Sequence, residues 1–177
     1  MGLFTSLVAA VYRRDNRRRI RRHGWTGIYV GDYHSIPTWA YTIGFDETLN
    51  QPEIVVFDIP RKGASELLWT TFERLKSGEL VLEDGALLDP TDPMPFTWRK
   101  VHPSQVAELE WLTLAKWRRF ERTGQAVGLE AFQMVLPDGE GRLPWQEGYD
   151  ERLRPRQPAL WLPFESGEPP LAASSGV

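Results

Sequence analysis

The sequence predicts a single α+β domain built on a mostly antiparallel sheet. Short strand-like segments and longer helix-like segments follow one another without the regular alternation that a doubly wound fold requires. The length of 177 residues suits one domain. We divide the chain into an N-terminal basic helix (1–22), an α+β domain (23–162) with two long packing helices, and a disordered tail (163–177) that is rich in Gly, Pro and Ser.

The first segment predicts one amphipathic helix that is apolar at its start and basic at its end. Residues 3–12 are apolar, whereas residues 13–22 hold seven arginines and Asp15, a net charge of +6 that leaves −9 on the rest of the chain. One helical side collects apolar positions and then continues as basic ones: Leu3, Leu7, Ala10, Val11, Arg14 and Arg18.

Three interpretations of this helix stay open. The helix docks on the domain by its apolar end with its arginines solvated, or it lies on a membrane surface, or it contacts nucleic acid. The acidic remainder of the chain would repel phosphate, which disfavours the last. The candidate contact residues for a membrane or a polyanion are Arg14, Arg17, Arg18 and Arg21.

Three strands are predicted next. Residues 26–30 alternate in polarity, and residues 39–44 end at Gly44, which punctuates the strand exit. Residues 54–59 form an almost continuous apolar run, which is typical of a central strand covered on both faces.

The first long helix is predicted from apolar residues at three- and four-residue spacing between 64 and 75, with Gly78 as its end. A short strand at 80–82, a loop at 83–95 and a strand at 96–101 follow.

The second long helix is predicted from Pro103 to Gly124. Its apolar residues cover more than one side, so it packs on two sides or on the domain and a partner. This pattern allows a homodimer through residues 104–123. A strand at 131–136, a turn at 137–141 and a returning strand at 142–145 complete the predicted sheet.

Composition excludes several classes of chemistry. The chain has no cysteine, so it has no disulfide, thiolate metal site or cysteine nucleophile, which suits a cytoplasmic location. Its charged segment follows the apolar one, the reverse of an export signal. No apolar run approaches the roughly 18 residues that span a bilayer.

No catalytic motif is present. The sequence lacks a Gly-x-Ser-x-Gly elbow and a phosphate-binding loop, and its three histidines do not form a HExxH motif. We therefore predict no metal and no cofactor. Two alternatives remain: a metal site that joins His23, His34 and Asp32, and an enzyme of unrecognised type that pairs His23 with Asp58 or Glu53.

Seven short motifs together resemble the bacterial family known as domain of unknown function 4262. The resemblance covers about residues 20–162 and implies a shared fold and surface, but no established activity. One departure is Asp58, where members commonly have glycine after the central strand. The motifs are 23–25 (His-Gly-Trp), 41–44 (Tyr-Thr-Ile-Gly), 52–55 (Pro-Glu-Ile-Val), 137–139 (Pro-Asp-Gly), 143–145 (Leu-Pro-Trp), 148–149 (Gly-Tyr) and 157–158 (Gln-Pro).

Aromatic residues within these motifs suit both a core and a binding cleft, and the core is the favoured interpretation. We predict a non-catalytic module that binds a small ligand or a protein, and expect the rings of Trp25, Tyr41 and Trp145 to meet at one locus. The candidate ligand-binding residues are His23, Trp25, Tyr41, Thr42, Trp145 and Gln157.

Overall fold

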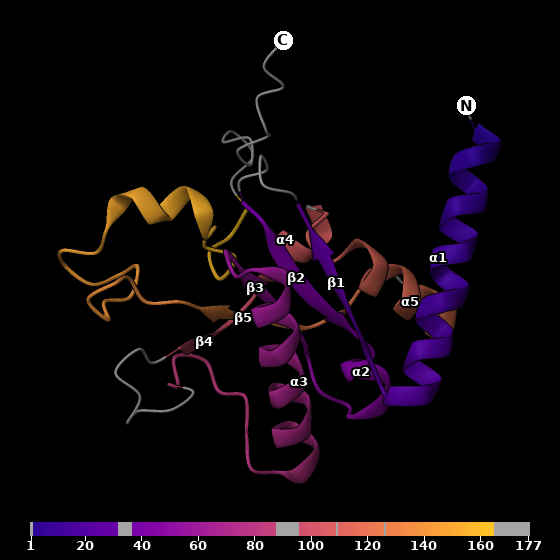
Figure 1. The fold of residues 1–177 in the computed structure, drawn as a ribbon, viewed down its shortest axis with the longest axis horizontal. Coiled ribbons are helices and arrows are strands. Elements are labelled where there is room, and N and C mark those ends of the chain that lie inside the picture. Colours follow the sequence, from indigo (N-terminus) through magenta and orange to yellow (C-terminus); the bar gives the residue numbers. More distant parts are fainter. Residues whose placement is uncertain (1, 32–36, 88–95, 109, 126, 165–177) are drawn as a thin grey trace.

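The computed structural model describes residues 2–31, 37–87, 96–108, 110–125 and 127–164, with side chains from residue 13 onward. It confirms the α+β fold (Figure 1). In chain order the elements are α1 (Gly2–His23), β1 (Thr26–Val30), β2 (Trp39–Ile43), α2 (Phe45–Thr48), β3 (Glu53–Phe57), α3 (Arg61–Ser77), β4 (Thr97–Lys100), α4 (Pro103–Glu108), α5 (Thr113–Thr123), β5 (Ala131–Val135) and the 3₁₀ helix η1 (Glu151–Arg156).

The five strands form one sheet in the order β1-β2-β3-β5-β4. Every pair is antiparallel except the β3–β5 pair, which is parallel, so the prediction of a mostly antiparallel sheet is confirmed. All five residues of β3 are buried, as the apolar run predicted for a central strand.

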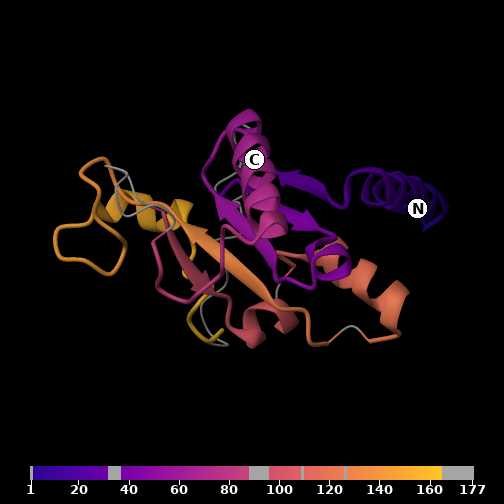
Figure 2. The ribbon, with the colours of Figure 1, turned by 90° about the horizontal axis from the view of Figure 1, so that it is seen from below.

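Helices cover both faces of the sheet, and each face has its own core. Figure 2 shows α3 on one side of the strands and α4 with α5 on the other. Alternate residues of β3 point to opposite faces, so Val56 packs on the α3 side and Val55 on the α5 side. The sheet therefore separates two groups of aromatic residues.

The prediction of one long second helix is wrong, because the helix is interrupted between α4 and α5. Leu112, which precedes α5, leaves the helical conformation with φ −124°. The break frees the carbonyl of Trp111 to accept a hydrogen bond from Trp39 Nε1 at 3.1 Å. It also places the Trp111 ring edge-on to Phe57, with centroids 5.4 Å apart. An unbroken helix would use that carbonyl within its own ladder.

Two predicted short strands are not formed. Residues 80–82 have no partner strand, and the neighbouring sheet contact is a single bridge between Leu87 and Thr97. The turn at 138–142 does close, through a hydrogen bond from Asp138 N to Arg142 O, but residues 142–145 then leave the sheet. Most of the predicted tail, residues 165–177, lies outside the described residues.

The docking interpretation of α1 also needs correction. The anchor lies in the arginine-rich half: Ile20 is buried in the core on the α5 side, and Arg17 pairs with Glu121 of α5 at 2.6 Å. Arg13 lies over the Trp117 ring, 5.4 Å from its centroid. These two arginines therefore contact α5, although the Arg17 side chain stays 46% exposed.

Asp58 follows β3 with a positive φ of 57°, which explains why a glycine suits this position. Its carboxylate pairs with Arg156 at 2.7 Å. We expect Asp58→Gly to unfold within about 1 kcal/mol of the wild type, because relief of the backbone strain offsets the lost pair. Asp58→Ala should lose about 1 kcal/mol, since it keeps the strain without the pair. Urea unfolding of both variants tests this order, and a more stable alanine variant would contradict it.

Candidate functional site

The structure places the predicted ligand residues in three separate regions, so the expectation that the rings meet at one locus is wrong. Trp25 is buried on the α3 side, stacked 5.9 Å from Phe72. Tyr41 is buried on the opposite side of the sheet. Trp145 is exposed and lies beside Arg99 of β4. Strand alternation and the intervening sheet keep Trp25 apart from Tyr41.

His23 does not meet a carboxylate. It is exposed at the end of α1, whereas Glu53 and Asp58 lie at opposite ends of β3. The described hydrogen bonds of Glu53 come from Thr42, Gly44 and Asp46, and the described partner of Asp58 is Arg156. The acid–base pair proposed for an enzyme is therefore not formed among the described residues.

Thr42 and Glu53 form a buried polar joint between β2 and β3. The Thr42 hydroxyl donates to Glu53 Oε2 at 2.6 Å and accepts from Ile54 N at 2.8 Å. Glu53 Oε1 accepts from Gly44 N at 2.8 Å and from Asp46 N at 3.4 Å. The carboxylate satisfies the backbone where β2 turns into α2, which is a structural role for both motif residues.

Burial raises the pKa of Glu53, and the hydrogen bonds from Thr42 and the backbone N–H groups oppose part of this rise. The folded protein therefore holds a proton on Glu53 at a pH where the unfolded chain has already lost it. Its side chain is buried and is hydrogen-bonded within the fold.

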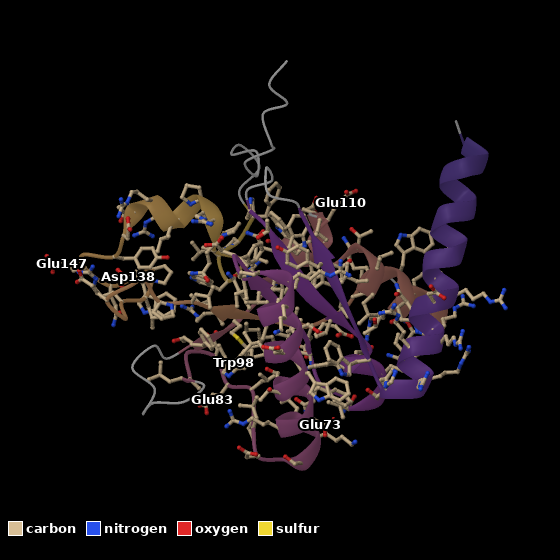
Figure 3. All side chains as sticks on the ribbon, viewed as in Figure 1. Glu73, Glu83, Trp98, Glu110, Asp138 and Glu147 are labelled. Carbon is tan, nitrogen blue, oxygen red and sulfur yellow. The ribbon has the colours of Figure 1, made fainter. Side chains whose placement is uncertain are left out.

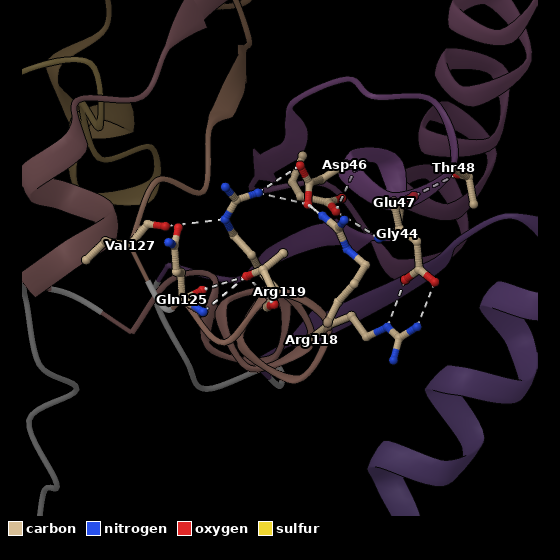
Figure 4. Close-up of polar contacts among 11 residues, drawn as sticks. Gly44, Asp46, Glu47, Thr48, Arg118, Arg119, Gln125 and Val127 are labelled. Carbon is tan, nitrogen blue, oxygen red and sulfur yellow. Dashed lines mark hydrogen bonds and ion pairs between the residues drawn. The ribbon is translucent and has the colours of Figure 1, made fainter.

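Ion pairs join α2, which follows β2, to α5 (Figure 4). Arg118 makes two hydrogen bonds to Glu47, at 2.7 and 2.8 Å. Arg119 bonds Asp46 at 2.9 Å, and Arg122 also contacts Asp46. The acidic residues that follow β2 therefore position α5 and do not form an open anionic site.

Four of the family-type motifs lie in or next to one segment, residues 136–156, which we call the extension. The extension projects from the β4–β5 end of the sheet (Figure 1). Figure 3 shows Asp138 there, on the side of the molecule opposite α1.

Asp138 is buried and binds several backbone N–H groups of the extension. Its carboxylate accepts hydrogen bonds from the N–H groups of Glu140 and Arg142 at 2.9 Å and of Asp150 at 3.2 Å. The Arg142 side chain adds a bond at 3.0 Å. Burial raises the pKa of Asp138, but these hydrogen bonds outweigh that effect and hold the value at about 2.

Two glutamines fix the return of the chain to the sheet. Gln157 accepts from Leu136 N at 2.7 Å and donates to Leu136 O at 3.0 Å, as a strand partner would. Gln133 of β5 donates to Pro158 O and accepts from Leu160 N. Gln157 is thus a structural residue. Gln133 lies in no motif, although a lone amide in a fully buried strand signals a required hydrogen-bond partner.

We expect Asp138→Ala to loosen the extension, since it leaves three N–H donors without their acceptor. Amide hydrogen exchange at Glu140, Arg142 and Asp150 should accelerate, while Glu140→Ala, a change of an exposed side chain, should leave it unaltered. Because the pKa of Asp138 is lowered, its ionised carboxylate stabilises the folded protein at any pH above the ordinary Asp pKa. This stabilisation is lost as the pH falls through about 2. Unchanged exchange in Asp138→Ala would contradict this role.

An accessible aromatic surface lies where the extension meets β4. Trp145 is 46% exposed. The Arg99 guanidinium lies 5.0 Å from the Trp145 centroid and 5.1 Å from the Trp161 centroid, and the two indoles meet edge-to-face at 5.5 Å. Asp84 orients Arg99 through a 3.0 Å hydrogen bond. We call Arg99, Trp145 and Trp161 the indole–arginine surface.

The sequence identified only Trp145 of this surface. Trp161 comes after the last motif, and Arg99 lies in an ordinary alternating strand, so neither carries a local signal. Within the described ranges no three His, Asp or Glu side chains gather as a metal site would require; His34 and Asp32 of the predicted alternative lie outside these ranges. No described helix is both long and apolar enough to cross a bilayer.

The fold and this surface define a class: an α+β domain whose motif residues mainly hold the fold together and support an exposed indole ring at Trp145. The family model described as Domain of unknown function (DUF4262) matches residues 19–150. The chain therefore belongs to this family. No curated protein and no solved structure matches it.

Proposed function

We propose that this protein is a non-catalytic module that binds a protein partner through the indole–arginine surface. The observation that carries the proposal is the exposure of Trp145 on a firmly held support. Trp and Arg are the residues that most often dominate binding energy at protein interfaces. Burial of this half-exposed indole is the largest apolar gain that the surface offers a partner.

The support for Trp145 favours recognition over a purely structural role. Trp98, the neighbour of Arg99 on β4, is fully buried and serves the core. Trp145 instead lies on the outside of an extension that Asp138 and Gln157 hold in place. A ring that is already fixed before binding loses little conformational entropy when a partner covers it.

The geometry also suggests the chemistry of the partner. A broad exposed indole suits an aromatic or proline side chain, and the neighbouring guanidinium suits a carboxylate that competes with Asp84. Small ligands are usually enclosed in a concave pocket. The half-exposed ring therefore favours a protein segment.

The test is selection of peptides from a random library on the full-length protein, with affinities measured by calorimetry. Selected peptides should lose at least about tenfold in affinity with Trp145→Ala. Trp69→Ala is a matched control, because Trp69 is 47% exposed on α3 but lies outside this surface. Peptides whose affinity ignores Trp145, or falls equally in both variants, would refute the proposal.

A second interface is favoured by α5, where Trp117 and Phe120 are each 48% exposed. We propose that these rings contribute to a homodimer through residues 104–123. Light scattering should give a dimer for the wild type and a monomer for Phe120→Ser. A wild-type monomer at high concentration would exclude the homodimer.

The cytoplasmic location stays a prediction.

A further inference from the structure

The α1 helix carries a set of arginines that the fold does not use. Arg13 and Arg17 contact Trp117 and Glu121 of α5. The others are exposed, and none of them forms an ion pair with a described residue: Arg14, Arg18, Arg19, Arg21 and Arg22. Five uncompensated cations on one helix are unusual in a chain whose remaining residues are acidic.

Three of these arginines share one side of α1. Arg14, Arg18 and Arg21 follow one another at four- and three-residue spacing, which returns to the same helical side. Arg13, Arg17 and Ile20 repeat the same spacing one position earlier and make the contacts to the body. The arginine side is therefore about 100° around the helix from the residues that contact α5, and its three arginines are exposed.

The same side continues as apolar positions toward the N-terminus. In the sequence, Leu3, Leu7 and Val11 precede Arg14 at three- and four-residue spacing, and residues 2–12 contain no charge. Helix α1 is unbroken from Gly2 to His23. Its positions therefore change along one side from apolar to basic, the composition of a helix that lies in a membrane interface.

The arginines of this side are accessible. Figure 1 shows α1 at one edge of the molecule, with its N-terminal turns extending beyond α5. Figure 2 also places α1 at the margin. The described contacts of α1 lie at Arg13, Arg17 and Ile20. Arg14, Arg18 and Arg21 are exposed, so a flat surface can reach the arginines of this side.

We propose that α1 binds the surface of an anionic bilayer. The apolar positions enter the boundary between headgroups and acyl chains, while Arg14, Arg18 and Arg21 contact lipid phosphates. The net charge of −9 outside residues 13–22 repels the rest of the chain from the same lipids. Contact is thus confined to α1, and the indole–arginine surface stays free.

A lipid surface fits α1 better than a nucleic acid does. Nucleic acid affinity comes mainly from phosphate contacts, which would leave the uncharged half of the helix without a role. A bilayer uses both halves, because lipids supply phosphate and an apolar phase at one surface.

The experiment is co-sedimentation of the full-length protein with vesicles of phosphatidylcholine alone or mixed with phosphatidylglycerol. Binding should require the anionic lipid. The triple change Arg14→Gln, Arg18→Gln and Arg21→Gln should weaken it roughly 100-fold. Arg61→Gln, Lys62→Gln and Lys76→Gln make the same change of net charge on exposed positions of α3 and should leave binding almost unchanged.

A second variant separates lipid from nucleic acid. Leu3→Ser, Leu7→Ser and Val11→Ser together should abolish vesicle binding, although every arginine and the Ile20 anchor remain. Circular dichroism of each variant confirms that the fold is kept. Equal binding to both vesicle types, binding that survives the serine changes, or tighter binding to duplex DNA than to anionic vesicles would each overturn the proposal.

Discussion

Gly44→Ala is expected to destabilise the protein by about 3 kcal/mol or more. Gly44 has a φ of 116°, which a side chain strongly disfavours. An added Cβ would lie 2.8 Å from Gly24 O and 3.1 Å from Trp25 Cα, so the backbone of the α1–β1 connection would have to move. Chemical denaturation followed by tryptophan fluorescence measures the loss.

Gly78→Ala supplies the control for this prediction. Gly78 ends α3 with a φ of 78°, but a Cβ there meets no atom within 4 Å. It should lose only about 1 kcal/mol, the cost of the left-handed conformation itself. Equal losses in the two variants would show that the contact between Gly44 and Gly24 does not matter.

Glu53→Ala is the second large effect, with an expected loss of about 3 kcal/mol or more. It removes the acceptor of Thr42, Gly44 and Asp46 from a buried site. Glu53→Gln keeps one acceptor oxygen and should lose about 1 kcal/mol. Urea unfolding compares the two, and an alanine variant as stable as the glutamine variant would rule out this role.

Glu53→Gln also predicts a pH dependence. Burial raises the pKa of Glu53 in the folded state. Protonation of Glu53 therefore adds to the free energy of unfolding, and this contribution is fully present below the ordinary Glu pKa. That contribution is lost as the pH rises through the folded value. The wild type should therefore lose its advantage over Glu53→Gln as the pH rises above the ordinary Glu pKa. A difference in unfolding free energy that is constant with pH would contradict the raised pKa.

The sequence predicted the elements whose signals are local. The apolar run of β3, the spacing of α3 and its end at Gly78, and the alternation of β1 all depend on neighbouring residues. The break between α4 and α5 could not be predicted locally, because its reason is a hydrogen bond from Trp39, far away in the chain. The strands expected at 80–82 and 142–145 failed because pairing needs a partner edge, which local pattern does not reveal.

The site was harder to predict than the fold. The motifs marked residues that matter, but sequence alone could not separate structural polar groups from exposed ones. Thr42 and Gln157 proved to satisfy buried backbone groups, while Arg99 and Trp161, which have no motif, complete the indole–arginine surface. Burial and hydrogen bonding, which decide these roles, emerge only when distant segments meet.

The parallel pairing of β3 with β5 has a consequence for the newly made chain. β1, β2 and β3 are neighbours in sequence and can pair as soon as they leave the ribosome. The fully buried β3 then presents an open edge until α3, β4, α4, α5 and finally β5 have been synthesised. During translation this apolar edge is the part of the nascent protein most prone to aggregation, and the part that a chaperone would gain most by covering.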